Sequence, residues 1–117
     1  MNIIGTSKIN WDMLSCNPNA IHLIENTLDS SKINWDLLSE NLNAIHLLEA
    51  NPNKINWRLL SKNPNAIHLL EQNQENIDWN YLSSNPNAIT LLENNPSKID
   101  WDLLSTNPNA INLFEQN

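Results

Sequence analysis

The sequence contains little cysteine, glycine or positive charge. Cys16 is the only cysteine among 117 residues, so no intramolecular disulfide can form, and we expect a reducing, cytosol-like compartment. Six Lys and Arg stand against 13 Asp and Glu, which gives a net charge of -7. An acidic chain repels phosphate backbones and anionic lipid surfaces, so we expect neither nucleic acid nor a membrane as a partner. The single glycine leaves no Gly-rich phosphate loop, and we expect no cofactor and no enzyme activity.

Long hydrophobic runs are also absent. No apolar stretch approaches the ~18–20 residues of a membrane span, and "MNIIGTS" at residues 1–7 does not have the pattern of a signal peptide. These features predict a cytoplasmic protein. The chain length suits one domain, which we place at residues 8–117 after an N-terminal lead at 1–7.

Asparagine, in contrast, is abundant, and it recurs in a fixed phrase. The chain has 24 Asn, and "NPNAIHLLE" at 63–71 has near copies at 17–25 and 41–49. The Trp residues mark the same period, with steps of 24, 22, 22 and 22 between Trp11, Trp35, Trp57, Trp79 and Trp101. The chain therefore divides into five repeats, at 8–31, 32–53, 54–75, 76–97 and 98–117. A unit of 22 residues cannot bury its own apolar face, so neighbouring repeats must stack.

Apolar spacing within the unit predicts helices. In "AIHLLE" at 44–49 the apolar residues stand at i, i+1, i+3 and i+4, which is a helix face and not the alternation of a strand. A leucine-rich horseshoe has a similar period, but it requires LxxLxLxxN, and Asp36 stands where that pattern has Leu. The sequence therefore predicts an all-α solenoid of five short two-helix repeats, in which the first helix of each pair is α or partly 3₁₀.

Capping residues predict where the helices begin. Asn56 is a good N-cap, so the first helix of the third repeat is expected to start at Trp57. Asn63 and Pro64 predict a second helix over about 64–71, because Asn caps free amides and Pro suits the first helical position. Since glycine is scarce, Asn is expected to supply the left-handed residues of the turns.

The unit INWxLLSxNPNAIHLLExNxxK resembles the short Asn/Trp/Leu tandem repeats of proteins predicted from giant DNA virus genomes. The resemblance covers residues 8–117, and Leu42, Asn76 and an insertion within "NTLDSSK" at 26–32 depart from the pattern. It is similar, more loosely, to other compact two-helix solenoids. The resemblance implies an α-solenoid and a viral protein of the host cytoplasm, but no particular activity, because such arrays are largely uncharacterised.

Residue types with chemical potential have structural interpretations here. The five Trp residues lead helices with apolar partners, so we expect a core ladder and not a binding stripe. His22, His46 and His68 occupy one equivalent position, but no second ligand accompanies each, so we expect no metal site. Cys16 varies to Glu, Lys, Ser and Thr in the other repeats, which indicates an exposed position and no nucleophile.

Polar positions that do not vary suggest repeated hydrogen bonds. Ser15, Asn19 and Glu25 keep the same residue type in every repeat. We expect the Asn19 equivalents to form an inner amide ladder, and the Glu25 equivalents to accept from amides at the start of neighbouring first helices. Recent duplication would also leave these residues alike.

Positions that do vary predict two exposed stripes, one on each helix, where partner specificity would lie. The candidate interaction residues are Asp36, Glu40, Arg58, Lys62, His22, His46 and His68. Stacking predicts that Arg58 approaches Asp36 and that Lys62 approaches Glu40, because each pair shares one repeat position.

The fifth repeat keeps its full apolar set, so we expect its outer face to associate. The candidate self-association residues are Trp101, Ile111, Leu113 and Phe114. A homo-oligomer through this repeat could be a two-fold dimer or a head-to-tail stack. At the other end, Met1, Ile3 and Ile4 are expected to form a partial lid.

The sequence as a whole predicts a non-enzymatic repeat scaffold for protein–protein interaction, whose protein partner it does not identify. The alternative is a structural or self-assembling unit, or a fragment of a longer array, with no separate ligand.

Overall fold

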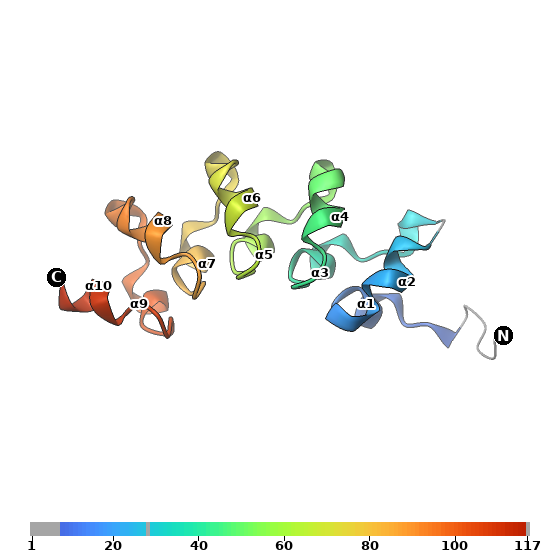
Figure 1. Cartoon of the computed structure of the whole chain (residues 1–117), viewed down its shortest axis with the longest axis horizontal. Coiled ribbons are helices and arrows are strands. Elements are labelled where there is room, and N and C mark those ends of the chain that lie inside the picture. The colour runs from blue at the N-terminus through green and yellow to red at the C-terminus, as the bar shows by residue number, and fades with distance from the viewer. Residues whose placement is uncertain (1–7, 28, 117) are drawn as a thin grey trace.

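The chain is an all-α, solenoid-like stack of helix pairs. The computed structural model describes residues 8–27 and 29–116, so the lead at 1–7, with its expected lid, lies outside the described residues. The described helices form five pairs that follow one another along an elongated body of 58 × 24 × 17 Å (Figure 1). None of the described residues lies in a β-strand, which excludes the leucine-rich horseshoe.

The first helix of each pair begins at its Trp, as predicted. These helices are α1 (Trp11–Ser15), α3 (Trp35–Ser39), α5 (Trp57–Leu60), α7 (Trp79–Ser83) and α9 (Trp101–Leu104). Each follows an Asn or Asp whose side chain accepts a backbone N–H three residues later, as Asn56 does from Leu59 at 3.1 Å. This contact satisfies one of the free amides at a helix start. It also fixes the same start in every repeat.

The second helix begins later than the sequence predicted. These helices are α2 (Ile21–Glu25), α4 (Ile45–Ala50), α6 (Ile67–Glu71), α8 (Ile89–Glu93) and α10 (Ile111–Glu115). The expected start at Pro64 is therefore wrong by three residues, since α6 starts at Ile67. The Asn63 side chain accepts the N–H of Asn65 at 3.0 Å, so it caps a tight turn before the helix rather than the helix itself.

Short 3₁₀ helices complete the repeats. One lies inside the first repeat, and the others connect successive pairs: η2 (Pro18–Ala20), η3 (Ser30–Lys32), η4 (Pro52–Lys54), η5 (Gln74–Asn76) and η6 (Pro96–Lys98). The insertion is accommodated before η3, where the Asp29 carboxylate accepts the Ser31 hydroxyl and N–H; these bonds lower the pKa of Asp29. No described residue has a positive φ, so the expectation of left-handed Asn is wrong: 3₁₀ turns and extended residues make the corners instead.

The fully buried centre is one column of residues that recurs in the second, third and fourth repeats and opens in part at the two ends of the stack. In the third repeat its members are Leu60, Ser61, Asn63, Ala66 and Leu70. The column therefore contains two polar residues per repeat, and buried polar groups need hydrogen-bond partners. It is the part of the structure that holds neighbouring repeats together.

The Ser of the column joins two repeats through its hydroxyl. Ser61 Oγ donates to the Trp57 carbonyl at 2.7 Å and accepts the N–H of Asp78, the cap residue of the next repeat, at 2.9 Å. The same pair of bonds recurs around Ser15, Ser39 and Ser83. The predicted repeated hydrogen-bond role of this Ser is therefore confirmed.

Two Asn ladders run along the stack, and the buried one is not the ladder that the sequence predicted. The inner ladder consists of Asn41, Asn63, Asn85 and Asn107, which are buried. The outer ladder consists of Asn43, Asn65, Asn87 and Asn109, which are exposed and each donate to one carbonyl of the preceding repeat. The inner position lies two residues before the predicted one, and its equivalent residue is also Asn in all five repeats. This invariance was the signal that could have identified it.

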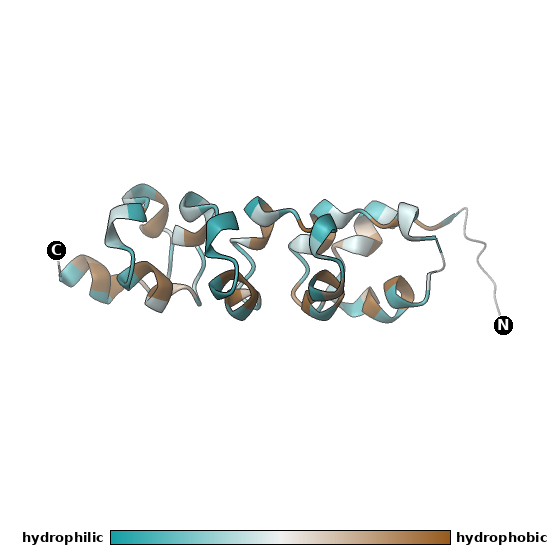
Figure 2. Cartoon of the chain, turned by 90° about the horizontal axis from the view of Figure 1, so that it is seen from above, coloured by the Kyte–Doolittle hydropathy of each residue, from teal (hydrophilic) through white to brown (hydrophobic). Residues whose placement is uncertain are grey.

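The Trp side chains line the core but do not form it. Trp11, Trp35, Trp57 and Trp79 are half-buried and pack against the core cluster, and Trp101 is exposed. Lysines of the following repeat lie over two of the rings, 4.9 Å from the Trp79 centroid and 5.9 Å from that of Trp11. The expected Trp core ladder is thus a half-exposed row at the edge of the core. Figure 2 shows that helices combine hydrophobic and hydrophilic residues, as amphipathic elements of a thin stack do.

Candidate interaction surfaces

The first-helix stripe consists of Asp36, Glu40, Arg58 and Lys62. Lys62 Nζ lies 3.5 Å from Glu40 Oε1 across the repeat boundary, so this predicted contact is confirmed. The predicted contact of Arg58 with Asp36 is wrong, because Arg58 Nε lies 3.8 Å from Asp78 Oδ2 in the following repeat.

A geometric rule explains the direction in which Arg58 reaches. The second residue of a first helix lies beside the cap residue of the next repeat, as the bond of 3.1 Å from Asn34 Nδ2 to Asp12 Oδ1 shows. Arg58 is the equivalent of Asp12, and Asp78 is the equivalent of Asn34. Equivalent positions in the sequence would pair Arg58 with Asp36. The offset between neighbouring repeats instead places Arg58 beside Asp78, the N-cap residue of the following repeat.

The basic residues of the first-helix stripe are already engaged within the chain. Arg58 and Lys62 both lie over the Tyr81 ring, 5.1 and 5.7 Å from its centroid. Together with Glu40 and Asp78 they form one cluster that spans the second, third and fourth repeats. Contacts of this kind stabilise weakly, but they engage both basic residues of the stripe. Asp36, by contrast, is exposed and makes no ion pair or hydrogen bond with the described side chains.

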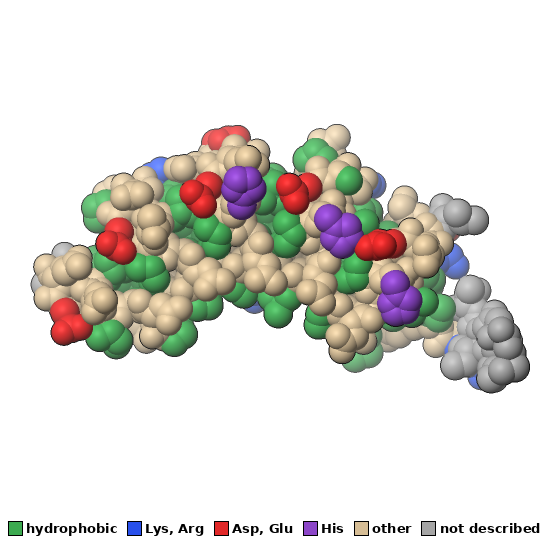
Figure 3. Space-filling model, viewed as in Figure 1, with side chains coloured by type: hydrophobic (Ala, Val, Ile, Leu, Met, Phe, Trp, Pro, Cys, Tyr) green, Lys and Arg blue, Asp and Glu red, His purple; other side chains and the backbone are tan. Residues whose placement is uncertain are grey.

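The second-helix row consists of the three His and the five equivalent Glu residues. It comprises His22, His46, His68, Glu25, Glu49, Glu71, Glu93 and Glu115, all of which are exposed. Figure 3 shows the His side chains alternating with acidic side chains along the side of the molecule that carries these helices. The seven candidate residues therefore divide between two helix rows and do not form one patch (Figure 1).

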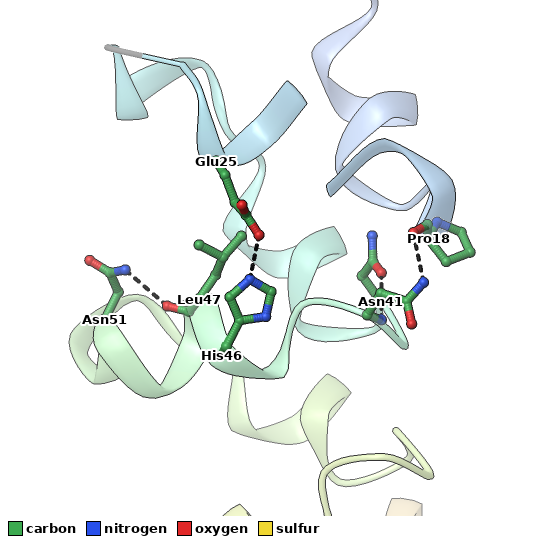
Figure 4. Close-up of polar contacts among 7 residues, drawn as sticks. Pro18, Glu25, Asn41, His46, Leu47 and Asn51 are labelled. Carbon is green, nitrogen blue, oxygen red and sulfur yellow. Dashed lines mark hydrogen bonds and ion pairs between the residues drawn. The ribbon is translucent and has the colours of Figure 1, made fainter. Parts of the chain in front are cut away.

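One contact links members of this row. His46 Nε2 on α4 lies 2.5 Å from Glu25 Oε1 on α2 (Figure 4). His68 Nε2 instead lies 3.2 Å from Gln72 Nε2 on its own repeat. The His residues consequently have no shared partner, and their common position reflects exposure rather than a common contact.

The Glu residues of the row do not have the role that the sequence predicted. They were expected to accept from amides at the start of neighbouring first helices, but those amides are capped by Asn10, Asn34, Asn56, Asp78 and Asp100. Among described side chains, only Glu25 has a polar contact within this row. The row is therefore a regular series of exposed carboxylates, one in each repeat.

Metal-binding and nucleophilic groups are not brought together in the described part of the chain. Over residues 8–27 and 29–116, no three His, Cys, Asp or Glu side chains converge as metal ligands. Cys16 is exposed, and its thiol donates to the Met13 carbonyl at 3.2 Å. The absence of metal binding stays a prediction, which a zinc titration with the His46→Ala control would test.

The C-terminal candidates form a small apolar surface from which one member is missing. Trp101 and Phe114 pack edge to face, with ring centroids 5.5 Å apart and an interplanar angle of 68°. Ile111 and Phe114 are exposed. Leu113, which the sequence also predicts in this patch, is only 5% exposed, so it does not belong to the exposed apolar surface.

Comparison with protein-family models, with curated proteins and with solved structures finds no match for this chain. The resemblance to giant-virus tandem repeats therefore remains a prediction from the sequence. No helix in the described residues has the length and apolar character that crossing a bilayer requires. The candidate surfaces must consequently be judged on their own chemistry.

Proposed function

We propose that this protein is a non-enzymatic repeat scaffold that binds an extended, basic protein segment along its second-helix row. The observation that carries the proposal is the row of Glu25, Glu49, Glu71, Glu93 and Glu115. These carboxylates are exposed and keep one repeat position, although they have no hydrogen-bond role in common. An exposed charge that recurs without an internal contact is available to a partner.

The two stripes differ in what they leave available, and this difference favours the second-helix row. Arg58 and Lys62 of the first-helix stripe already have Asp78, Glu40 and Tyr81 as neighbours. The Glu row has one internal contact, from His46 to Glu25. The net charge of -7 adds long-range attraction for a basic segment and repulsion for an acidic one.

Repeat geometry specifies the form of the ligand. The first helices of neighbouring repeats pack against each other, as α3 does against α5. Packed helices lie ~8–10 Å apart, which sets the step from one repeat to the next, and an extended chain rises ~3.3 Å per residue. A basic residue at every third position of an extended segment would therefore meet one carboxylate per repeat. Solenoids bind partners along such extended surfaces, and each exposed pair adds only ~0–1 kcal/mol, so affinity depends on matching several repeats at once.

A peptide series tests the proposal. The probe is a labelled 15-residue peptide, Lys-Gly-Ser repeated five times, compared with a peptide of equal composition whose five Lys are contiguous. We expect the spaced peptide to bind more tightly in fluorescence anisotropy, and the triple variant Glu49→Gln, Glu71→Gln, Glu93→Gln to lose most of that affinity. Equal binding of both peptides would reduce the interaction to net charge and contradict the proposal.

A matched control variant separates the effect of the Glu row from the effect of net charge. The variant Asp36→Asn, Glu75→Gln, Asp102→Asn removes the same three charges from exposed positions outside the row. It should retain the preference for the spaced peptide. Loss of that preference in the control would place the binding surface on the first helices instead.

The alternative, a structural or self-assembling unit, has an observation of its own. The outer face of the fifth repeat exposes Trp101, Ile111 and Phe114. Association through this face would be compatible with partner binding along the side of the stack.

A further inference from the structure

The four repeat boundaries carry the same hydrogen bonds in the same direction. At each boundary the cap residue of the following repeat donates its N–H to the Ser hydroxyl of the preceding one, at 2.9–3.0 Å. The inner-ladder Asn of the following repeat donates Nδ2 to the carbonyl of that Ser at 3.0–3.1 Å. The outer-ladder Asn donates to a further carbonyl at 2.7–2.8 Å. In these three kinds of hydrogen bond the donor always comes from the following repeat and the acceptor from the preceding one.

The fifth repeat exposes the acceptor half of this boundary. Ser105 is exposed, whereas Ser15, Ser39, Ser61 and Ser83 are fully buried by the repeats that follow them. Over the described residues, no group donates to the Ser105 hydroxyl or carbonyl. The apolar part is open too: Phe114 is 37% exposed, while its equivalents Ile24, Leu48, Leu70 and Leu92 are 0–2% exposed.

The first repeat exposes the donor half. Asn17 and Asn19 are exposed, and their Nδ2 groups donate to no residue of the described chain. Leu23 is 48% exposed, while among its equivalents Leu47 is partly buried and Leu69, Leu91 and Leu113 are 5–8% exposed.

A hollow beside Leu23 shows what is missing at this end. It measures about 420 Å³ and is lined by Trp11 and Leu14 among others. The corresponding hollow in the fifth repeat measures about 220 Å³, because Glu93 and Pro96 of the preceding repeat form one wall.

The two open faces also match in residue type. At the boundary between the first and second repeats, Asp12 bonds Asn34, Ser15 bonds Asn34 and Asn41, and Glu25 contacts His46. The outer face of the fifth repeat offers Asp, Ser and Glu at the equivalent positions 102, 105 and 115. The first repeat offers Asn, Asn and His at 10, 17 and 22. A junction between the two faces would therefore repeat the internal boundary residue for residue.

We propose that the fifth repeat of one copy binds the first repeat of a second copy, head to tail, with the geometry of the internal boundaries. Two fifth repeats facing each other would place carbonyl acceptors against carbonyl acceptors, so a two-fold dimer would lack the cap and Asn donors that every internal boundary has. The head-to-tail contact is heterologous and leaves one open face at each end, so it produces a growing chain of copies. This inference is independent of the proposed function, because it uses the ends of the stack and not the Glu row.

Sedimentation velocity across a dilution series tests the proposal. The weight-average mass should rise with concentration past twice the 13.4 kDa of one chain, without a plateau at the dimer. It should also rise with ionic strength, because salt screens the repulsion between copies of net charge -7. A monomeric mass at every concentration and salt level would overturn the proposal, as would a plateau at two chains.

Two variants, each of which blocks one of the two end faces, provide the decisive experiment. Ile111→Lys blocks the acceptor face and Leu23→Lys blocks the donor face, and each variant alone should remain monomeric. An equimolar mixture should form a one-to-one dimer, because one intact face of each kind remains. The control Leu42→Lys makes the same charge change at an exposed position away from both ends, and it should associate like the unmodified chain.

The outcomes of this arm separate the contact modes. If Leu23→Lys alone still forms dimers, the fifth repeats bind each other and head-to-tail docking is wrong. If the mixture remains monomeric while the unmodified chain associates, the two faces are not complementary and the proposal fails. Circular dichroism of every variant verifies that the helices are retained.

Discussion

The buried column and the Trp row teach different things about repetition. The positions of Leu60, Asn63 and Trp57 each keep their residue type in all five repeats, yet Leu60 and Asn63 of the column are buried while Trp57 is partly exposed. A half-exposed Trp can be kept for its rim contacts, such as the lysine over Trp79. A buried Asn is kept because its partners are carbonyls that would otherwise lose water without replacement. A residue that is the same in every repeat therefore has a structural role, but a large apolar side chain such as Trp is not necessarily buried.

Leu60 gives the most direct test of whether the buried column contributes more to stability than the Trp row does. Leu60→Ala should lower the free energy of unfolding by about 3–5 kcal/mol, because it opens a cavity in the centre of the stack. Trp57→Ala should cost about 3 kcal/mol, at the lower end of that range, because part of the ~200 Å² of a Trp side chain stays in contact with solvent, so its removal leaves no closed cavity. Urea denaturation followed by circular dichroism measures both. A larger loss for Trp57→Ala would mean that the Trp row dominates the core after all.

Asn63 tests whether the polar part of the column matters as much as its apolar part. Asn63→Ala removes the cap to Asn65 and the two Nδ2 bonds to the carbonyls of Ser39 and Asn41, all at 3.0 Å. Leaving buried acceptors without a donor costs ~1–3 kcal/mol each, so we expect a total loss of about 2–3 kcal/mol after relaxation. Asn63→Asp, which keeps the cap and loses the donor, should be similarly destabilised at neutral pH. A loss below ~0.5 kcal/mol in both variants would show that the inner ladder is dispensable.

Much of this architecture could be predicted from the sequence, because the repeat period constrains it. The helical class, the first-helix starts at Trp and the Ser bond all follow from residue type and spacing. The second-helix start could not be predicted, because an Asn-Pro pair suits both a helix cap and the turn that Asn63 makes. The same ambiguity hides the inner ladder, since helix capping alone accounts for an Asn at this position.

The candidate surfaces were less predictable, because they depend on the stagger between repeats. The Lys62–Glu40 contact follows from equivalence in sequence, but the reach of Arg58 to Asp78 depends on how far each repeat is offset from the last. Likewise, Leu113 is buried while the adjacent Phe114 is 37% exposed, a difference that the apolar pattern of the repeat does not contain. Such offsets arise from packing between repeats, which a pattern within one repeat does not encode.

The outer Asn ladder shows how much burial matters, because its residues are also Asn but are exposed. Asn65→Ala removes one exposed bond of 2.8 Å, from Nδ2 to the Leu42 carbonyl. Because water can replace the lost donor, we expect a loss of about 0.5–1 kcal/mol, well below that of Asn63→Ala. The same urea series compares the two variants two residues apart. Equal losses would mean that burial does not distinguish the ladders.

The smallest effect is expected at Lys62, whose contact with Glu40 lies on the surface of the stack. Lys62→Met retains an unbranched apolar stem but removes the charge that lies 3.5 Å from Glu40 and over the Tyr81 ring. An exposed ion pair contributes ~0–1 kcal/mol and weakens with salt, so the loss should be below 1 kcal/mol at low salt and shrink at ~1 M. A double-mutant cycle with Glu40→Gln isolates the pair from the packing of the stem. A coupling energy that stays constant with salt would show that Lys62 stabilises the boundary through its stem and the Tyr81 ring. In that case the first-helix stripe would be part of the packing between repeats. Stability at the third repeat would then depend on an exposed row as well as on the buried column.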